Sequence, residues 1–189
     1  MKKFEKAFTL HEIIFSLLIL IIVSNFCYIK YIDFRDNYNI KIAKNAINEV
    51  FFLSSNLSLK NKTSYIVEFD NYTAELKLFQ KGKKELIKNY KLSDKLSYIT
   101  TDTNQSRYIR REFTADGNIA KSFSVYICDS RHIVKYRISF YGFDISKFLQ
   151  LNNYKKVAGE KVKRDAIYRY HNVISNDREL FEKEWKKEP

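Results

Sequence analysis

One uninterrupted apolar stretch, residues 8–29, constrains this chain more than any other feature of its sequence. Its 22 residues are enough for a helix to cross a hydrocarbon core of about 30 Å. The short segment before it holds Lys2, Lys3 and Lys6 against one acid, Glu5, and positive charge favours the cytoplasmic side of a membrane. We therefore expect a single-pass helix with a cytoplasmic N-terminus and the rest of the chain on the other side.

Three common kinds of apolar N-terminal segment are alternative interpretations of this stretch. A cleaved secretory signal needs small residues close to its cleavage site, and residues 24–28 do not supply them. A lipoprotein signal needs small residues directly before its cysteine, but Asn25 and Phe26 precede Cys27. A simple signal anchor fits the length and leaves Glu12 unexplained. An ionised acid costs about 2.5–3.5 kcal/mol at the centre of a membrane helix and less near its edge.

Residues 6–12, which read K-A-F-T-L-H-E before the apolar run, resemble the class III signal of type IV prepilins and pseudopilins. The resemblance implies that a prepilin peptidase cuts between Ala7 and Phe8, that residues 1–7 are a leader, and that the new N-terminus of Phe8 is methylated. It also implies that Glu12 pairs with the terminal amine of a neighbouring subunit and so sets their register. Ala7 stands where glycine is usual, and His11 where an aliphatic residue is commoner. With no proline after the span, these departures favour a minor component.

The same resemblance implies a function. The chain would be a minor pilin or pseudopilin of a type IV pilus, a type II secretion pseudopilus or a competence pseudopilus. Its partners would be the prepilin peptidase, other pilins or pseudopilins, and the assembly platform with its ATPase. It would reside in the inner or cytoplasmic membrane and enter a filament at the cell surface or in the periplasm. The alternatives are a pilin-like receptor that binds DNA for uptake, and an unrelated single-pass anchored protein.

The sequence contains none of the common catalytic motifs. It has no Gly-rich phosphate loop, H-E-x-x-H, G-x-S-x-G or C-x-x-C, and its histidines, His11, His132 and His171, are far apart. The two cysteines, Cys27 and Cys128, are neither a disulfide framework nor a metal site. We expect no enzymatic activity, no cofactor and no metal.

The apolar pattern continues with helical spacing beyond the membrane segment. We predict one helix from about Phe8 to Leu57, in which residues 30–60 are amphipathic and pack on a globular part. The apolar stripe is formed by Ile40, Ala43, Ile47, Val50, Ser54 and Leu57, with Asp36, Lys41, Lys44 and Asn48 between them.

From Ser64 the period changes to two, which predicts strands and an α+β fold with an antiparallel sheet over residues 61–149. A hairpin turns at Asp70 and Asn71 between strands that contain Tyr65–Phe69 and Ala74–Leu78. Further strands are expected at 85–92, 97–101, 110–114, 123–128 and 133–141. The turn from Phe113 to Gly117, followed by two strands and Gly142, resembles the C-terminal half of GspH/FimT-type minor pseudopilins.

Residues 150–189 are predicted to leave the sheet as a basic, partly helical tail, with a surface helix from Asp177 to Pro189. Six cations interleaved with tyrosines are candidates for nucleic-acid contacts: Lys155, Lys156, Lys161, Lys163, Arg164 and Arg169. A solvated tail, or a docking element for a neighbouring subunit, is the simpler interpretation. The net charge of +12, from 34 Lys and Arg against 22 Asp and Glu, also fits a general bias toward Lys, Asn and Ile.

Overall fold

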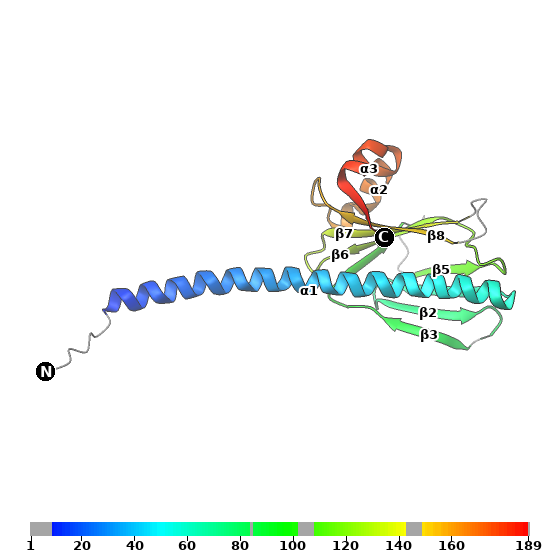
Figure 1. Cartoon of the computed structure of the whole chain (residues 1–189), viewed down its shortest axis with the longest axis horizontal. Helices are drawn as coiled ribbons and strands as arrows, with labels where there is room; N and C mark the ends of the chain where they lie inside the picture. The colour runs from blue at the N-terminus through cyan, green and yellow to red at the C-terminus, as the bar shows by residue number, and fades with distance from the viewer. Residues whose placement is uncertain (1–8, 84, 102–107, 143–148, 189) are drawn as a thin grey trace.

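The computed structural model describes residues 9–83, 85–101, 108–142 and 149–188. A long helix, α1 (Leu10–Asn61), extends its N-terminal half away from the rest of the molecule and lies with its C-terminal half along two antiparallel sheets (Figure 1). The fold class is α+β, as predicted.

The named strands form two sheets, and no strand belongs to both. Sheet A has the order β3 (Leu86–Lys91), β2 (Glu75–Gln80), β1 (Tyr65–Asp70) and β5 (Tyr108–Phe113). Sheet B has the order β4 (Ser97–Thr100), β6 (Phe123–Cys128), β7 (Val134–Tyr141), β8 (Gln150–Lys156) and β9 (Trp185–Glu188). A 3₁₀ turn, η1 (Arg164–Ala166), and two helices, α2 (Ile167–Asn176) and α3 (Arg178–Glu184), lie over the face of sheet B that is turned away from α1 (Figure 1).

Helix α1 is one continuous element of 52 residues, or about 78 Å at 1.5 Å per residue. It begins at a Thr9 cap and ends at Lys62, whose φ of 51° places it in the left-handed region that stops helices. No glycine or proline interrupts it. The predicted single helix is confirmed from Leu10 onward and runs four residues past Leu57, while Phe8 lies outside the described residues.

The predicted strands are confirmed, with small shifts at their ends. Strands β1 and β2 form the expected hairpin, in which Asp70 pairs with Glu75. The carboxylate of Asp70 accepts hydrogen bonds from the N–H groups of Tyr72 (2.8 Å) and Thr73 (3.2 Å), which fixes the turn. Ala74, which the alternation assigned to the second strand, belongs to the turn and has a φ of 54°.

The main core lies where α1 meets both sheets. The predicted stripe is buried at Ile40, Ala43, Ile47, Val50 and Ser54 and partly buried at Leu57. Beside the stripe, the Phe51 ring centroid lies 4.3 Å from that of Phe140, 5.7 Å from that of Phe123 and 5.9 Å from that of Phe113. Phe113 belongs to sheet A, and the other two rings belong to sheet B. One helical side chain therefore packs against both sheets, and truncating it to alanine would cost about 3–5 kcal/mol.

The prediction that the chain leaves the sheet after Gln150 is wrong. Residues Gln150–Lys156 pair with β7 as strand β8, and Trp185–Glu188 return as β9 to form the edge of sheet B. The surface helix expected from Asp177 is confirmed only over Arg178–Glu184. Between the two strands, α2 and α3 cover a second apolar cluster on the outer face of sheet B, which includes Tyr126, Ile167, Ile174 and Trp185.

The turn after Phe113 brings Gly117 into close contact with α1. Gly117 has a φ of +72°, and a Cβ there would lie 2.6 Å from Leu59 Cγ and 2.8 Å from the Ser55 carbonyl oxygen. The Ser55 hydroxyl donates to the Gly117 carbonyl at 2.6 Å. The turn therefore needs a residue without a side chain, both for its backbone conformation and for space.

Replacing Gly117 with alanine should reduce stability more than the same change at Gly82. Gly82 has a φ of +82°, but a Cβ at this position would have no neighbour within 4 Å. Gly82→Ala should therefore cost only the backbone strain of about 1–2 kcal/mol, and Gly117→Ala about 2 kcal/mol more. Thermal unfolding of the full chain in detergent, followed by circular dichroism, measures both. Equal losses would show that the contact with α1 is not tight.

Candidate functional site

The N-terminal half of α1 exposes apolar side chains all around the helix. Between Leu10 and Ile29 the large apolar residues are 48–69% exposed, whereas Ile47 and Val50 are fully buried further along the same helix. By its length and composition, the segment could cross a membrane. One helix thus has an apolar surface with no covering element among the described residues, joined directly to a half that is packed in a core.

Glu12 is bound to the N-terminus of its own helix. Its carboxylate accepts hydrogen bonds from the Thr9 backbone N–H (2.8 Å) and the Thr9 hydroxyl (3.0 Å), while the Thr9 hydroxyl oxygen accepts from the Glu12 N–H at 3.4 Å. This reciprocal arrangement is a capping box. The spacing Thr-x-x-Glu before an apolar run is its known sequence signature, so this role could have been found from the sequence. Ala7 and Phe8, the expected processing residues, lie outside the described part of the chain.

The exposed apolar surface continues past the expected span. Tyr31, Phe34, Tyr38 and Ile42 are 61%, 73%, 59% and 48% exposed, and they follow one another at spacings of three and four. They lie on the side of α1 away from the core. The second half of the helix is therefore apolar toward the sheets and also partly apolar toward solvent.

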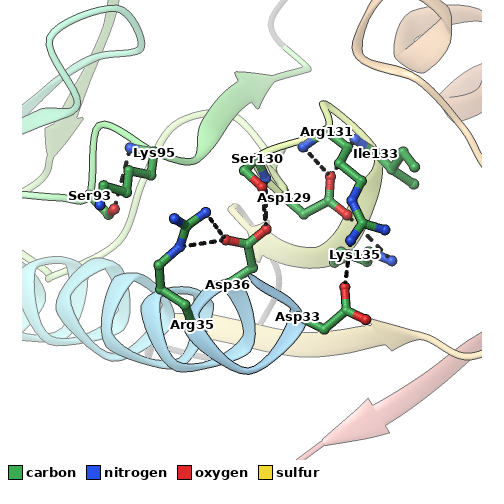
Figure 2. Close-up of polar contacts among 10 residues, drawn as sticks. All are labelled: Asp33, Arg35, Asp36, Ser93, Lys95, Asp129, Ser130, Arg131, Ile133 and Lys135. Carbon is green, nitrogen blue, oxygen red and sulfur yellow. Dashed lines mark hydrogen bonds and ion pairs between the residues drawn. The ribbon is translucent and has the colours of Figure 1, made fainter. Parts of the chain in front are cut away.

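Figure 2 shows a group of polar contacts where α1 enters the globular part. Asp36, which the sequence pattern placed among exposed polar residues, is only 5% exposed. Its carboxylate accepts hydrogen bonds from the Ser130 N–H (3.1 Å) and hydroxyl (2.5 Å) and pairs with Arg35 at 3.1 Å. Burial by itself would raise the pKa of Asp36, but these hydrogen bonds and the guanidinium charge outweigh it and lower the pKa.

The turn between β6 and β7 that carries Ser130 is itself held by carboxylates. Asp129 accepts hydrogen bonds from the N–H groups of Arg131 (3.0 Å) and Ile133 (2.9 Å). The Arg131 side chain reaches back to Asp33 on α1 at 3.0 Å (Figure 2). The turn and one helical turn of α1 are thus joined twice, once by a buried contact and once by an exposed one.

The six cations suggested for nucleic-acid contacts have different surroundings. Lys155 lines a hollow of about 410 Å³ between α1 and sheet B, with Lys41, Lys44, Tyr136 and Glu188. Lys161 lines a different hollow of about 140 Å³. Lys163 and Arg169 are exposed, and the Arg164 guanidinium lies 5.8 Å from the Tyr72 ring centroid. DNA binding by these residues stays a prediction.

Lys156 belongs to the interior. Its ammonium donates to Glu184 at 2.5 Å and to the Tyr170 hydroxyl at 2.9 Å, and the Lys156 and Glu184 side chains are 7% and 10% exposed. The Tyr170 hydroxyl also accepts from the Trp185 indole N–H at 2.7 Å. Lys156 therefore joins β8 to α2, α3 and β9 as a buried cation with its counter-ion, and it is not part of an exposed basic surface.

The comparisons with known proteins give distant likenesses. Neither a protein-family model nor a curated protein matches the chain. A structure of the minor pseudopilin EpsH from the type 2 secretion system of Vibrio cholerae is similar at 15% identity and a TM-score of 0.46, covering 59% of this chain and 94% of that one. The type IV minor pilin FimU of Pseudomonas aeruginosa is similar at 12% identity and 0.46, covering 62% and 91%. A second EpsH structure gives 14% and 0.44, covering 66% and 97%.

Among the described residues, no group of three or more His, Cys, Asp or Glu side chains is placed to hold a metal ion. Within the same residues, two carboxylates of α1 have unusual surroundings: Glu12 at the start of the helix and Asp36 where the helix enters the globular part. The first lies in the apolar half of the helix, and the second fixes the direction in which that half leaves.

Asp36→Ala should destabilise the globular part by about 2–3 kcal/mol, because it leaves the Ser130 donors and the Arg35 charge without their acceptor. Asp33→Ala, a matched control on the same helix, removes a pair whose side chains are 51% and 49% exposed and should cost less than about 1 kcal/mol. Chemical unfolding of the full chain in detergent measures both.

The Asp36 contribution should also depend on pH. Because the pKa of Asp36 is lower in the folded state than its ordinary value of 3.8, the stabilisation is complete above that value and is lost as pH falls through the folded pKa. The difference between wild type and Asp36→Asn should thus shrink from pH 7 to pH 3. A constant difference would contradict this assignment.

Proposed function

We propose that this chain is a minor subunit of a type IV pilin-like filament, anchored by the first half of α1 and assembled through it. The observation that carries the proposal is the combination of two features in one helix. The prepilin-like leader precedes an apolar half that is exposed in the isolated chain, and the other half packs in an α+β globular part.

The exposed apolar half needs a non-aqueous environment. Each large aliphatic side chain removed from water contributes about 1.5–3 kcal/mol, so a segment from Leu10 to Ile29 is strongly unfavourable in solution. A membrane provides that environment before assembly, and a bundle of neighbouring helices provides it in a filament. A subunit that moves between the two uses the same surface in both.

Glu12 gives this helix one charge at the edge of the apolar segment. Cleavage between Ala7 and Phe8 would remove the lysine-rich leader and leave an amine one residue before the Thr9 cap. The carboxylate of an adjacent subunit would neutralise that amine, and a pair of opposite charges among aliphatic side chains is favourable only in one register. The pair would thus fix how far one helix is displaced along the next.

The partners follow from this role. We propose a prepilin peptidase for processing, sibling pilins or pseudopilins for the filament, and a membrane platform with its ATPase for assembly. The chain would span the inner or cytoplasmic membrane once, with the globular part outside the cytoplasm.

Processing is tested by the mass of the mature chain. When the chain is produced with an active prepilin peptidase, its N-terminus should be Phe8, about 14 Da heavier than after cleavage alone because of methylation. Ala7→Gly should increase the processed fraction, and Ala7→Leu should decrease it. If Met1 is retained in the Ala7→Gly chain while the same peptidase processes its own substrate, the proposal is wrong.

Assembly is tested by separating the charge of Glu12 from its capping role. Glu12→Gln keeps a side chain that can accept the Thr9 hydrogen bonds and removes the charge, whereas Thr9→Ala weakens the cap by about 1 kcal/mol and keeps the charge. We expect Glu12→Gln to reduce incorporation into sheared filaments at least tenfold and Thr9→Ala to leave it nearly unchanged. Membrane insertion and the mature mass are the controls for both.

The opposite result has a clear meaning. If Thr9→Ala abolishes incorporation while Glu12→Gln assembles normally, the carboxylate acts only as a helix cap, and its pairing with a neighbour is excluded.

A further inference from the structure

The outer face of sheet B holds a partly buried cation, Arg137, whose surroundings differ from those of three others. Arg35, Lys44 and Lys156, with side chains 26%, 17% and 7% exposed, each pair with a carboxylate. Arg137 on β7 is also partly buried, but it forms no ion pair with a carboxylate among the residues that the structure describes. A partly buried guanidinium without a counter-ion is a candidate partner for an anionic group.

The guanidinium of Arg137 is held in place from several sides. It lies 5.6 Å from the ring centroid of Tyr126 on β6 and 5.2 Å from that of Phe181 on α3. Its Nε donates to the Ser124 hydroxyl at 3.2 Å, and that hydroxyl lies 3.2 Å from the Ser139 hydroxyl. The two ring contacts and the hydrogen bond at Nε restrict the position of the group. Within the described part of the chain, its two terminal nitrogens are left without an acceptor.

Arg137, Ser124 and Ser139 line an open hollow of about 170 Å³. Ser124 and Ser139 are 3% and 2% exposed, and they contribute hydroxyls from β6 and β7. His171 and Ser175 contribute from α2 on the other side. The hollow is smaller than the roughly 300–1,000 Å³ that encloses a drug-sized ligand, so it suits one polar group with a part of the molecule that carries it.

The remaining electrostatics favour a negative ligand. The Nδ1 atom of His171 lies within hydrogen-bond distance, 2.9 Å, of the Tyr126 hydroxyl. Burial and, to a smaller extent, the charge of Arg137 lower the pKa of His171 to about 4. The imidazole is therefore neutral at physiological pH, and its Nε2 lies 3.4 Å from the Ser175 hydroxyl. The only formal charge among the described lining residues is that of Arg137.

We propose that this hollow, the Arg137 site, binds an oxyanion group, such as the phosphate, sulfate or carboxylate of a ligand outside the cell membrane. A guanidinium with two free nitrogens offers paired donors that match two oxygens of one such group. The serine hydroxyls rotate to accept or donate at the remaining oxygens. No residue that lines the site belongs to α1, so the proposal does not require that the chain assembles into a filament.

Binding is measured by calorimetry on the full chain in non-ionic detergent, with inorganic phosphate, sulfate and glucuronate as three separate probes. Ionic strength is matched with sodium chloride, and neutral glucose is the control for glucuronate. We expect saturable binding of at least one probe. The order of the three affinities tells whether a phosphate, a sulfate or a carboxylated sugar is the better ligand.

Arg137→Gln should weaken that binding at least tenfold, and Arg137→Lys should weaken it severalfold because it keeps the charge but loses the paired donors. Arg169→Gln on the exposed part of α2 removes the same charge outside the site and should leave the affinity unchanged. Ser175→Trp at the rim should block the hollow with Arg137 intact, which covers the case in which Arg137→Gln fails to fold.

The proposal is overturned by any of three results. These are no saturable binding of any probe, equal losses in Arg137→Gln and Arg169→Gln, or unchanged affinity in a folded Ser175→Trp chain.

Discussion

The packing of α1 against two separate sheets is the constraint on which the rest of this structure depends. Sheets A and B share no ladder, and the helix side chains between them form a common core. Phe51 illustrates this dependence, because its ring contacts one phenylalanine of sheet A and two of sheet B. Without the helix, each sheet would expose an apolar face, so helix and sheets stabilise one another and neither is expected to persist alone.

The same helix passes from an exposed apolar half to a half packed on the sheets, and the contacts of Asp36 mark that change. The hydration that a buried carboxylate loses offsets only part of what its hydrogen bonds contribute here. The carboxylate also favours one arrangement strongly, since any other placement leaves Ser130 or Arg35 without a partner. The contact thus restricts the angle between the exposed half of α1 and the globular part, which would determine how the globular part is presented in the proposed filament.

Much of this fold could be predicted because its signals are local. The stripe through Ile40, Ile47 and Val50 specifies a helix, and the alternation in β1 and β7 specifies strands with one buried face. The two strands that sequence reasoning misses lack this signal. β8 reads Q-L-N-N-Y-K-K, and β9 is a four-residue edge strand with two lysines directly after a helix. Their pairing joins Lys156 to Trp185, which are far apart in sequence, so only the folded chain reveals it.

Of the candidate sites, too, those formed by neighbouring residues can be predicted from the sequence, and those formed by distant residues cannot. The capping box of Thr9 and Glu12 spans three residues and is readable from the sequence, although the charge of the carboxylate is the feature that first suggests a role. The burial of Asp36 depends on Ser130, 94 residues away, and that of Lys156 on Glu184, so both look like exposed polar residues in the sequence. Arg137 gives no sequence signal at all, because what distinguishes it is the absence of a described carboxylate near it in space.

The two roles of Glu12 have an energetic consequence. In the isolated chain, Thr9 donates two hydrogen bonds to the carboxylate, which compensates part of its lost hydration at the edge of an apolar segment. A neighbour's amine would therefore meet a carboxylate that is already partly satisfied, and the gain from pairing would be smaller than for a bare acid. It would still be favourable, because a carboxylate has four acceptor positions and the cap uses one oxygen. The cap would then hold the acid in position for a partner, which lowers the entropy lost when that partner arrives.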